Sequence, residues 1–174
     1  MRTLLLLRHG KSDWDHDLPD HDRTLSKRGR KAAKAMGKYI ASTGPRPTQV
    51  LCSDSKRTRE TWEIIAEADW GSEPPVCELL PELYLASTEG LLRRIRQVDA
   101  ETETLLVIAH EPGCSGLVHA LTGARMRYPT AALARIDTPH ENWRSLSENE
   151  GELRLLLPPK QLPVKNGGGA ALED

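Results

Sequence analysis

The sequence has almost no net charge and no long hydrophobic segment. Its 24 Lys and Arg residues are balanced by 25 Asp and Glu residues, so the net charge of -1 provides no general field for nucleic acid or an anionic membrane. The apolar run from Leu4 to Leu7 is too short for a membrane span or a signal-peptide core. We therefore expect a cytoplasmic protein with no nucleic-acid or membrane partner, in which any anion site is local.

Cysteine is also scarce, and its spacing excludes several kinds of site. Cys52, Cys77 and Cys114 form no C-x-x-C pair and show no zinc-ligand spacing. None has an arginine six positions later, as the cysteine-dependent phosphatases require. The pattern is typical of a reducing cytoplasm, and we expect all three to be small buried hydrophobic residues.

Strand and helix patterns alternate along the chain, which predicts an α/β fold. The expected strands are 4–7, 48–53, 76–80, 104–109, 132–137 and 152–157. The expected helices are 26–42, 56–68, 88–98 and 112–122. We expect residues 1–157 to form one domain, a three-layer α/β/α sandwich with a mostly parallel central sheet. Residues 158–174, with Pro-Pro and Gly-Gly-Gly, are expected to be a flexible C-terminal tail.

Unusual side chains follow three of the predicted strands. Arg8-His9-Gly10 ends the first, Ser53 to Arg59 follows the second, and His110-Glu111-Pro112-Gly113 follows the fourth. These segments converge if the strands are parallel, because ligands bind outside the carboxyl ends of such strands. Two arginines and two histidines suit a phosphoryl group, since guanidinium groups bind its oxygens bidentately and stabilise negative charge.

His9 is the candidate nucleophile of this set. A neutral imidazole attacks phosphorus well, and its ordinary pKa of about 6.5 needs little adjustment at neutral pH. Two cationic neighbours are expected to keep His9 neutral. Taken alone, His9 also reads as a core histidine and Arg8 as a strand-end charge. The combination of all three segments favours the catalytic reading.

The same segments resemble the histidine phosphatase superfamily, the phosphoglycerate mutase-like proteins. Leu7-Arg8-His9-Gly10-Lys11-Ser12 is similar to the block that carries the phosphorylated histidine. Ser53-x-x-x-Arg57-Thr58-x-Glu60-Thr61 resembles the second block, and His110-Glu111-Pro112-Gly113 resembles the late block. The resemblance implies a phosphoglycerate mutase-like fold and a metal-independent phosphatase without a cofactor. It also implies that His9 is phosphorylated, while Arg8, Arg57 and His110 bind the phosphate.

Further segments resemble the SixA-type phosphohistidine phosphatases within that superfamily. These are Lys11-Ser12-Asp13-Trp14, the segment 83–87 and His-Glu-Pro-Gly. The resemblance implies a phosphorylated protein substrate, such as a phosphohistidine domain. A phosphatase of a small phosphate monoester is the alternative, and a non-catalytic phosphate-binding module is disfavoured by the intact set of four residues. Asp54 departs from the proline that often follows the serine of the second block.

Two roles stay open in the sequence. Glu82 lies where the wider superfamily carries a proton donor, and its alternative is a surface carboxylate. Ser12 offers its hydroxyl either to the phosphate or to a turn. The acidic segment 13–22 lacks the fixed offsets and turn glycine of a hard-cation loop, so we expect a solvated acidic loop and no metal site.

Overall fold

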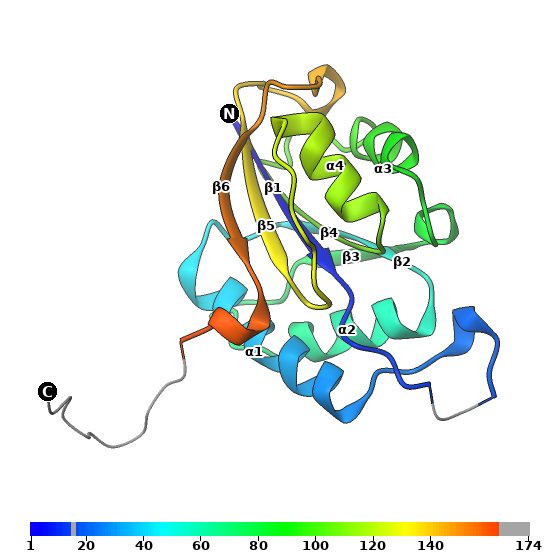
Figure 1. The fold of residues 1–174 in the computed structure, drawn as a ribbon. Coiled ribbons are helices and arrows are strands. Elements are labelled where there is room, and N and C mark those ends of the chain that lie inside the picture. Colours follow the sequence, from blue (N-terminus) through cyan, green and yellow to red (C-terminus); the bar gives the residue numbers. More distant parts are fainter. Residues whose placement is uncertain (15–16, 164–174) are drawn as a thin grey trace, which may run out of the picture.

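The structure is a computed structural model that describes residues 1–14 and 17–163. Within these residues six strands form one sheet in the order β3-β2-β4-β1-β5-β6 (Figure 1). The strands are β1 Arg2–Arg8, β2 Gln49–Ser53, β3 Val76–Leu80, β4 Thr104–Ala109, β5 Leu133–Thr138 and β6 Glu152–Leu157. Strands β1 to β4 run parallel to one another. At one side of the sheet β5 is antiparallel to β1, and the edge strand β6 is antiparallel to β5. The predicted mostly parallel sheet is confirmed.

Helices cover both faces of this sheet. They are α1 Lys27–Thr43, α2 Lys56–Ala66, α3 Thr88–Ile95 and α4 Gly113–Thr122. Helices α1 and α2 lie on one face, and α3 and α4 lie on the other (Figure 1). Short 3-10 turns complete the described chain: η1 Asp20–Asp22, η2 Pro81–Leu83, η3 Trp143–Ser145 and η4 Pro159–Gln161. The α/β/α sandwich is thus present as predicted.

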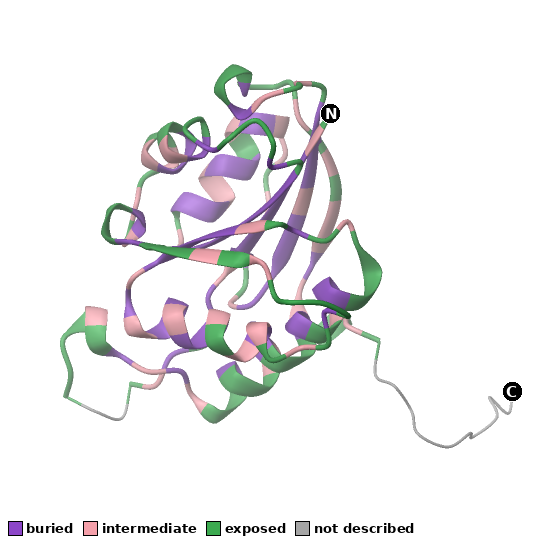
Figure 2. Cartoon of the chain, turned by 180° about the vertical axis from the view of Figure 1, so that it is seen from behind, coloured by how far each residue is buried: buried purple, intermediate pink, exposed green. Residues whose placement is uncertain are grey.

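The leucine run of β1 explains why this strand lies inside the sheet. Side chains of a strand alternate between the two faces, so Leu5 and Leu7 join the core under α1 and α2. Leu4 and Leu6 join the separate core under α3 and α4. All four are almost completely buried, as are the other central strands (Figure 2). A strand that is covered on both faces needs a continuous apolar run.

Helix α1 begins as its sequence predicts. Ser26 is the N-cap residue, and its hydroxyl accepts a hydrogen bond of 3.0 Å from the backbone N–H of Gly29. The apolar spacing of this helix predicts that Ala32, Ala35, Met36, Tyr39 and Ile40 share the face towards the core. The prediction is wrong for Ala35, which is exposed, and Ala33 is buried in its place. Met36 and Ile40 are buried as predicted.

The packed part of the chain continues beyond residue 157. Residues 159–161 form the turn η4, and Leu162 packs against the core under α1 and α2. The remainder of the expected tail, residues 164–174, lies outside the described residues.

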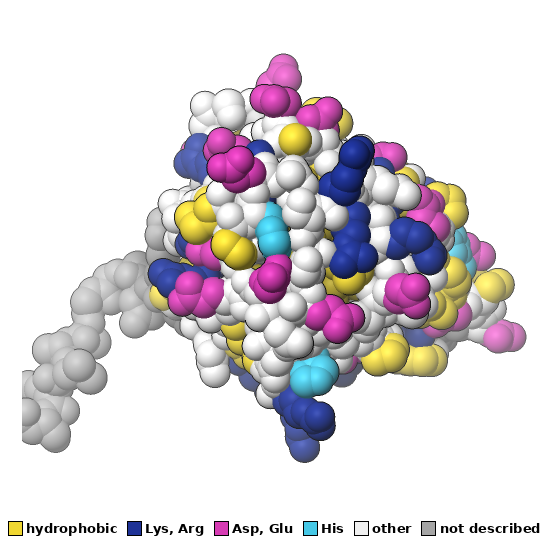
Figure 3. All heavy atoms as spheres, turned by 90° about the horizontal axis from the view of Figure 1, so that it is seen from above, with side chains coloured by type: hydrophobic (Ala, Val, Ile, Leu, Met, Phe, Trp, Pro, Cys, Tyr) yellow, Lys and Arg dark blue, Asp and Glu magenta, His cyan; other side chains and the backbone are white. Residues whose placement is uncertain are grey.

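The surface and the cysteines agree with the composition. Acidic and basic side chains are interspersed on the face shown in Figure 3, in keeping with the net charge of -1. Cys52 and Cys114 are buried as expected, whereas Cys77 is partly exposed. In the described part of the chain, no helix is long and apolar enough to cross a bilayer.

Candidate active site

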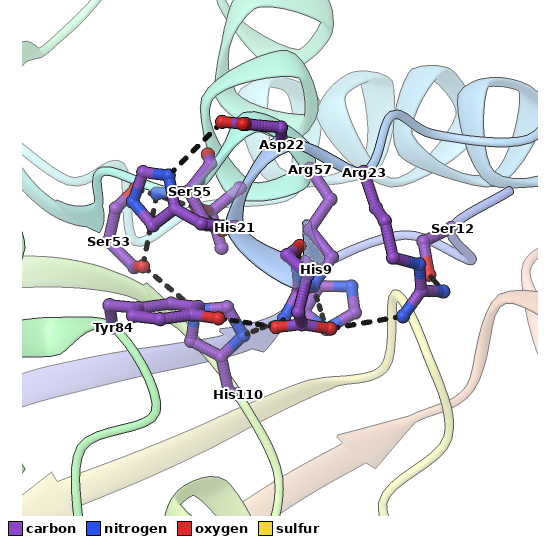
Figure 4. A network of polar contacts seen from close by, with 12 residues as sticks. His9, Ser12, His21, Asp22, Arg23, Ser53, Ser55, Arg57, Tyr84 and His110 are labelled. Atoms are coloured by element: carbon purple, nitrogen blue, oxygen red, sulfur yellow. Dashed lines mark hydrogen bonds and ion pairs between the residues drawn. The ribbon is translucent and has the colours of Figure 1, made fainter. Parts of the chain in front are cut away.

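Three neighbouring strands bring the predicted site residues together. Because β1, β4 and β2 are adjacent and parallel, the residues at their carboxyl ends meet at one edge of the sheet. They surround a cavity of about 400 Å³. Its lining includes Arg8, His9, Ser12, Arg23, Arg57 and His110. Figure 4 shows how His9, Ser12, Arg23, Arg57 and His110 lie relative to one another.

The hydrogen bonds of His9 fix which ring nitrogen is available for attack. Nδ1 lies 2.6 Å from the carbonyl oxygen of Gly10. A carbonyl oxygen only accepts, so Nδ1 carries the proton and Nε2 keeps its lone pair. The Nε–H of Arg57 donates to Nε2 at 3.3 Å. The tautomer and the orientation of the ring therefore both direct Nε2 towards Arg57.

His9 is neutral at pH 7 for reasons that were only partly predictable from the sequence. Burial is the largest effect, and it lowers the pKa of His9 from 6.5 to about 4. The hydrogen bond to Gly10 opposes this shift, because it favours the protonated ring. The charges of Arg57, Arg8 and Arg23 lower the pKa further. The predicted cationic neighbours are present, but desolvation matters more.

His110 lies beside His9, with 5.1 Å between the ring centroids. Arg57 Nη2 donates to its Nδ1 at 3.4 Å, so the proton of His110 sits on Nε2 and is donated to Ser53 Oγ at 2.8 Å. Burial is the largest effect on the pKa of His110, which is lowered to about 3. The positive charge of a protonated His9 and that of Arg57 lower it further. A serine hydroxyl both donates and accepts, so Ser53 also fits the tautomer in which His110 donates from Nδ1.

The two predicted arginines differ in how they are held. Arg57 is 4% exposed, and besides His9 and His110 it binds the backbone oxygen of Asp20 through Nη1 at 2.7 Å. Arg8 donates from Nη1 to the backbone oxygen of Tyr128 at 2.8 Å. Its Nε is buried and has no hydrogen-bond partner among the described residues. A buried donor of this kind suits an anionic ligand.

The remaining residues of the second sequence block hold the backbone around the cavity. The carboxylate of Glu60 accepts from the backbone N–H of Leu25 at 2.7 Å, and Thr61 Oγ1 accepts from the N–H of Gly10 at 3.1 Å. A Cβ atom on Gly10 would lie 2.9 Å from the carbonyl oxygen of Gly29. Gly10 therefore permits a close contact with α1, and its N–H is already used by Thr61.

Sequence reasoning missed the part that the segment before α1 plays in this cavity. Arg23 is 6% exposed and lines the cavity, and its guanidinium stacks on Trp14 at 3.1 Å from the ring centroid. Asp20 and Tyr84 contact Arg57 and each other. The acidic segment was expected to be solvated, and the side chain of Asp20 is 47% exposed, but its carboxylate also pairs with Arg23 and Arg57, which was not expected. Only its proximity to Arg23 in the sequence hinted at an ion pair.

Ser12 and Glu82 occupy different environments. Ser12 is buried, lines the cavity and accepts a hydrogen bond from Arg23 Nη2. Glu82 does not line the cavity: its side chain is 56% exposed, and its carboxylate lies 3.7 Å from Arg94 Nε. Of the two roles left open for Glu82, this position agrees with the surface carboxylate, because the side chain extends from turn η2 to Arg94 of α3 and to solvent.

We therefore expect Glu82→Gln to change the turnover of both aryl and alkyl phosphates by less than about twofold, as for an exposed residue distant from the reacting atoms. A proton donor behaves differently, because an alkyl phosphate has the poorer leaving group and needs the proton more. Steady-state kinetics with both ester classes provides the measurement. A selective loss with the alkyl ester would return Glu82 to the mechanism.

In the part of the chain that the structure describes, no group of three or more His, Cys, Asp or Glu side chains is arranged to hold a metal ion. His21 instead pairs with Asp54, with 2.9 Å between Nε2 and Oδ1. This contact is the largest cause of a raised pKa of His21. It also holds turn η1 against Asp54, the residue found in place of the proline that often follows the serine of the second block.

Comparison with known proteins agrees with this geometry. Residues 4–106 match the family described as the histidine phosphatase superfamily (branch 1). An uncharacterised protein of Mycobacterium leprae is 30% identical over 161 residues, which cover 84% of this chain and 96% of that protein.

Two solved structures share the fold along most of the chain. A candidate phosphohistidine phosphatase SixA from Nakamurella multipartitia is 26% identical with a TM-score of 0.79, covering 91% of this chain and 96% of its own. A candidate SixA from Agrobacterium tumefaciens is 25% identical with a TM-score of 0.77, covering 91% and 98%.

Proposed function

Because this chain belongs to the histidine phosphatase superfamily and is a phosphatase of the SixA type, we propose that it hydrolyses protein phosphohistidine in the cytoplasm, with His9 as the nucleophile. The observation that carries the proposal is the neutral His9 ring with its Nε2 lone pair directed towards Arg57. No metal is needed, since arginines supply the positive charge that a phosphoryl group requires.

The reaction has two steps. In the first, His9 Nε2 forms a bond to phosphorus while the bond from phosphorus to the leaving atom breaks, and Arg8 and Arg57 balance the charge on the phosphoryl oxygens. In the second, a water oxygen attacks phosphorus, the bond to Nε2 breaks and orthophosphate forms. His110 donates to a phosphoryl oxygen when its proton is on Nδ1, with Ser53 donating to Nε2.

The substrate class follows from the leaving group and from the rim of the cavity. When the bond from phosphorus to a substrate phosphohistidine breaks, the histidine ring leaves as a neutral imidazole, because its other ring nitrogen takes a proton from solvent. The absence of Glu82 from the cavity is therefore tolerated. Trp14 and Leu85 line the cavity, and they are 75% and 55% exposed. Exposed apolar side chains beside a phosphate site suit contact with a protein surface. The SixA-type names of the two similar structures point to the same substrate class.

The test compares a labelled phosphohistidine protein with a panel of small phosphate monoesters, each measured without EDTA, with EDTA, and with magnesium or zinc added back. We expect kcat/KM to be at least about tenfold higher for the protein substrate. The His9→Ala variant measures the spontaneous hydrolysis that has to be subtracted.

Faster turnover of an ester would identify the protein as a small-molecule monoester phosphatase. Loss of activity in EDTA that magnesium or zinc restores would contradict the metal-independent reaction. No turnover of any substrate would leave only a phosphate-binding module.

A further inference from the structure

The carboxylate of Asp20 occupies a position among the cations of the cavity. Its Oδ1 accepts from Arg23 Nη1 at 3.1 Å, and its Oδ2 accepts from Arg57 Nη2 at 3.1 Å. The hydroxyl of Tyr84 donates to the same Oδ2 at 2.5 Å. Figure 4 shows how Arg23, Arg57 and Tyr84 converge from separate elements. Each carboxylate oxygen thus binds an arginine in the way that a phosphoryl oxygen does.

Asp20 is less firmly enclosed than the arginines that it binds. Its side chain is 47% exposed, whereas those of Arg57 and Arg23 are 5% and 7% exposed. It belongs to η1, a three-residue turn without buried residues, which the His21 contact with Asp54 holds against the start of α2. The carboxylate is therefore able to turn towards solvent while the two guanidinium groups stay in place.

Asp20 carries a negative charge at neutral pH. The hydrogen bond from Tyr84 is the first cause of a pKa of Asp20 lowered to about 2, and Arg57 and Arg23 contribute, whereas partial burial opposes the shift. A carboxyl with this pKa is a poor proton donor. It is a permanent negative charge beside the phosphate site.

Resting on the proposed function of this cavity, we propose that Asp20 is an internal anion that competes with the phosphoryl group for Arg23 and Arg57. Asp20 neutralises the two arginines before substrate binds. It gives them up to the incoming phosphoryl group and returns to them as orthophosphate leaves. Arg23 is accordingly a third arginine of the phosphate site, beside Arg8 and Arg57. The consequence is weak binding of free orthophosphate, which limits inhibition by the product.

The experiment is a calorimetric titration of the full chain with orthophosphate, alongside product-inhibition kinetics. Asp20→Asn removes the charge with little change in shape, and we expect it to bind orthophosphate at least about tenfold more tightly, with a parallel fall in the inhibition constant. Asp22→Asn is the matched control. It removes the same charge from the same turn, but Asp22 pairs with His21, and the orthophosphate affinity of this variant should stay within about twofold of wild type.

The outcomes separate this inference from the proposed function. If wild-type protein binds orthophosphate and Asp20→Asn binds it equally or more weakly while melting like wild type, Asp20 only positions the arginines and the inference is wrong. Equal tightening by Asp22→Asn would show a general charge effect and also overturn it. If neither wild type nor Asp20→Asn binds orthophosphate, the phosphate site itself is misassigned. Asp20→Ser serves as the second uncharged variant if Asp20→Asn fails to fold.

Discussion

His9→Ala is expected to abolish both turnover and labelling of the protein by a radioactive phosphoryl donor. Removal of a covalent nucleophile costs on the order of 10⁴-fold or more in rate, because the positioned charges that remain have no atom to which they can deliver the phosphoryl group. A phosphoramidate on imidazole is labile in acid and stable in alkali, whereas a phosphoserine ester behaves in the opposite way. Wild-type enzyme quenched in alkali should therefore retain label on His9.

Two further histidine variants sharpen this measurement. His110→Ala removes a hydrogen-bond partner of Arg57 and Ser53 but leaves Nε2 of His9, so turnover should fall while some labelling persists. His119→Ala is the matched control, since His119 is exposed on α4 and its ring contacts the backbone oxygen of Gly123 at 3.2 Å, away from the cavity. Label that survives acid and maps to Ser12 or Ser53 would overturn the central mechanism.

Arg57→Lys should be nearly as damaging as Arg57→Ala, with each losing about 10²-fold or more in kcat/KM. The guanidinium of Arg57 contacts His9, His110 and Asp20 at once through different nitrogens. A single ammonium reproduces neither this arrangement nor the paired hydrogen bonds to a phosphoryl group. The measurement is steady-state kinetics together with orthophosphate affinity.

Arg59→Lys is the appropriate control for that comparison, because Arg59 lies on the same helix but does not line the cavity. It should retain activity within about twofold. Near wild-type kinetics for Arg57→Lys would mean that one positive charge suffices there, and the bidentate role of Arg57 would have to be withdrawn.

Most of the fold was predictable because the sequence marks its elements with local signals. Residues 76–80, 104–109 and 152–157 were predicted as strands, and β3, β4 and β6 have these bounds. The serine cap of α1 was equally clear. The exposure of Ala35 was not predictable, because a residue as small as alanine fits both the buried and the exposed face of a helix. Tertiary packing decides on which face it lies.

The candidate site was predictable where it depends on strand ends and not where it depends on loop paths. Arg8, His9, Arg57 and His110 line the cavity as expected, because parallel strands place their carboxyl ends at one edge. The positions of Asp20 and Arg23 instead follow from contacts far apart in sequence, such as Leu25 with Glu60 and His21 with Asp54. No periodicity reports such contacts. The direction of Glu82 likewise depends on the geometry of turn η2.

The parts of the chain that surround the cavity differ in local stability, because β1 lies inside the sheet and turn η1 does not. β1 is hydrogen-bonded along its length to β4 and β5, and the N–H of His9 donates to the oxygen of Ala109 at 3.2 Å. Opening this strand requires breaking the middle of the sheet, a nearly global event, whereas turn η1 opens without disturbing any strand. His9 therefore belongs to the last unit of the protein to unfold, whereas Asp20, in turn η1, belongs to one of the first.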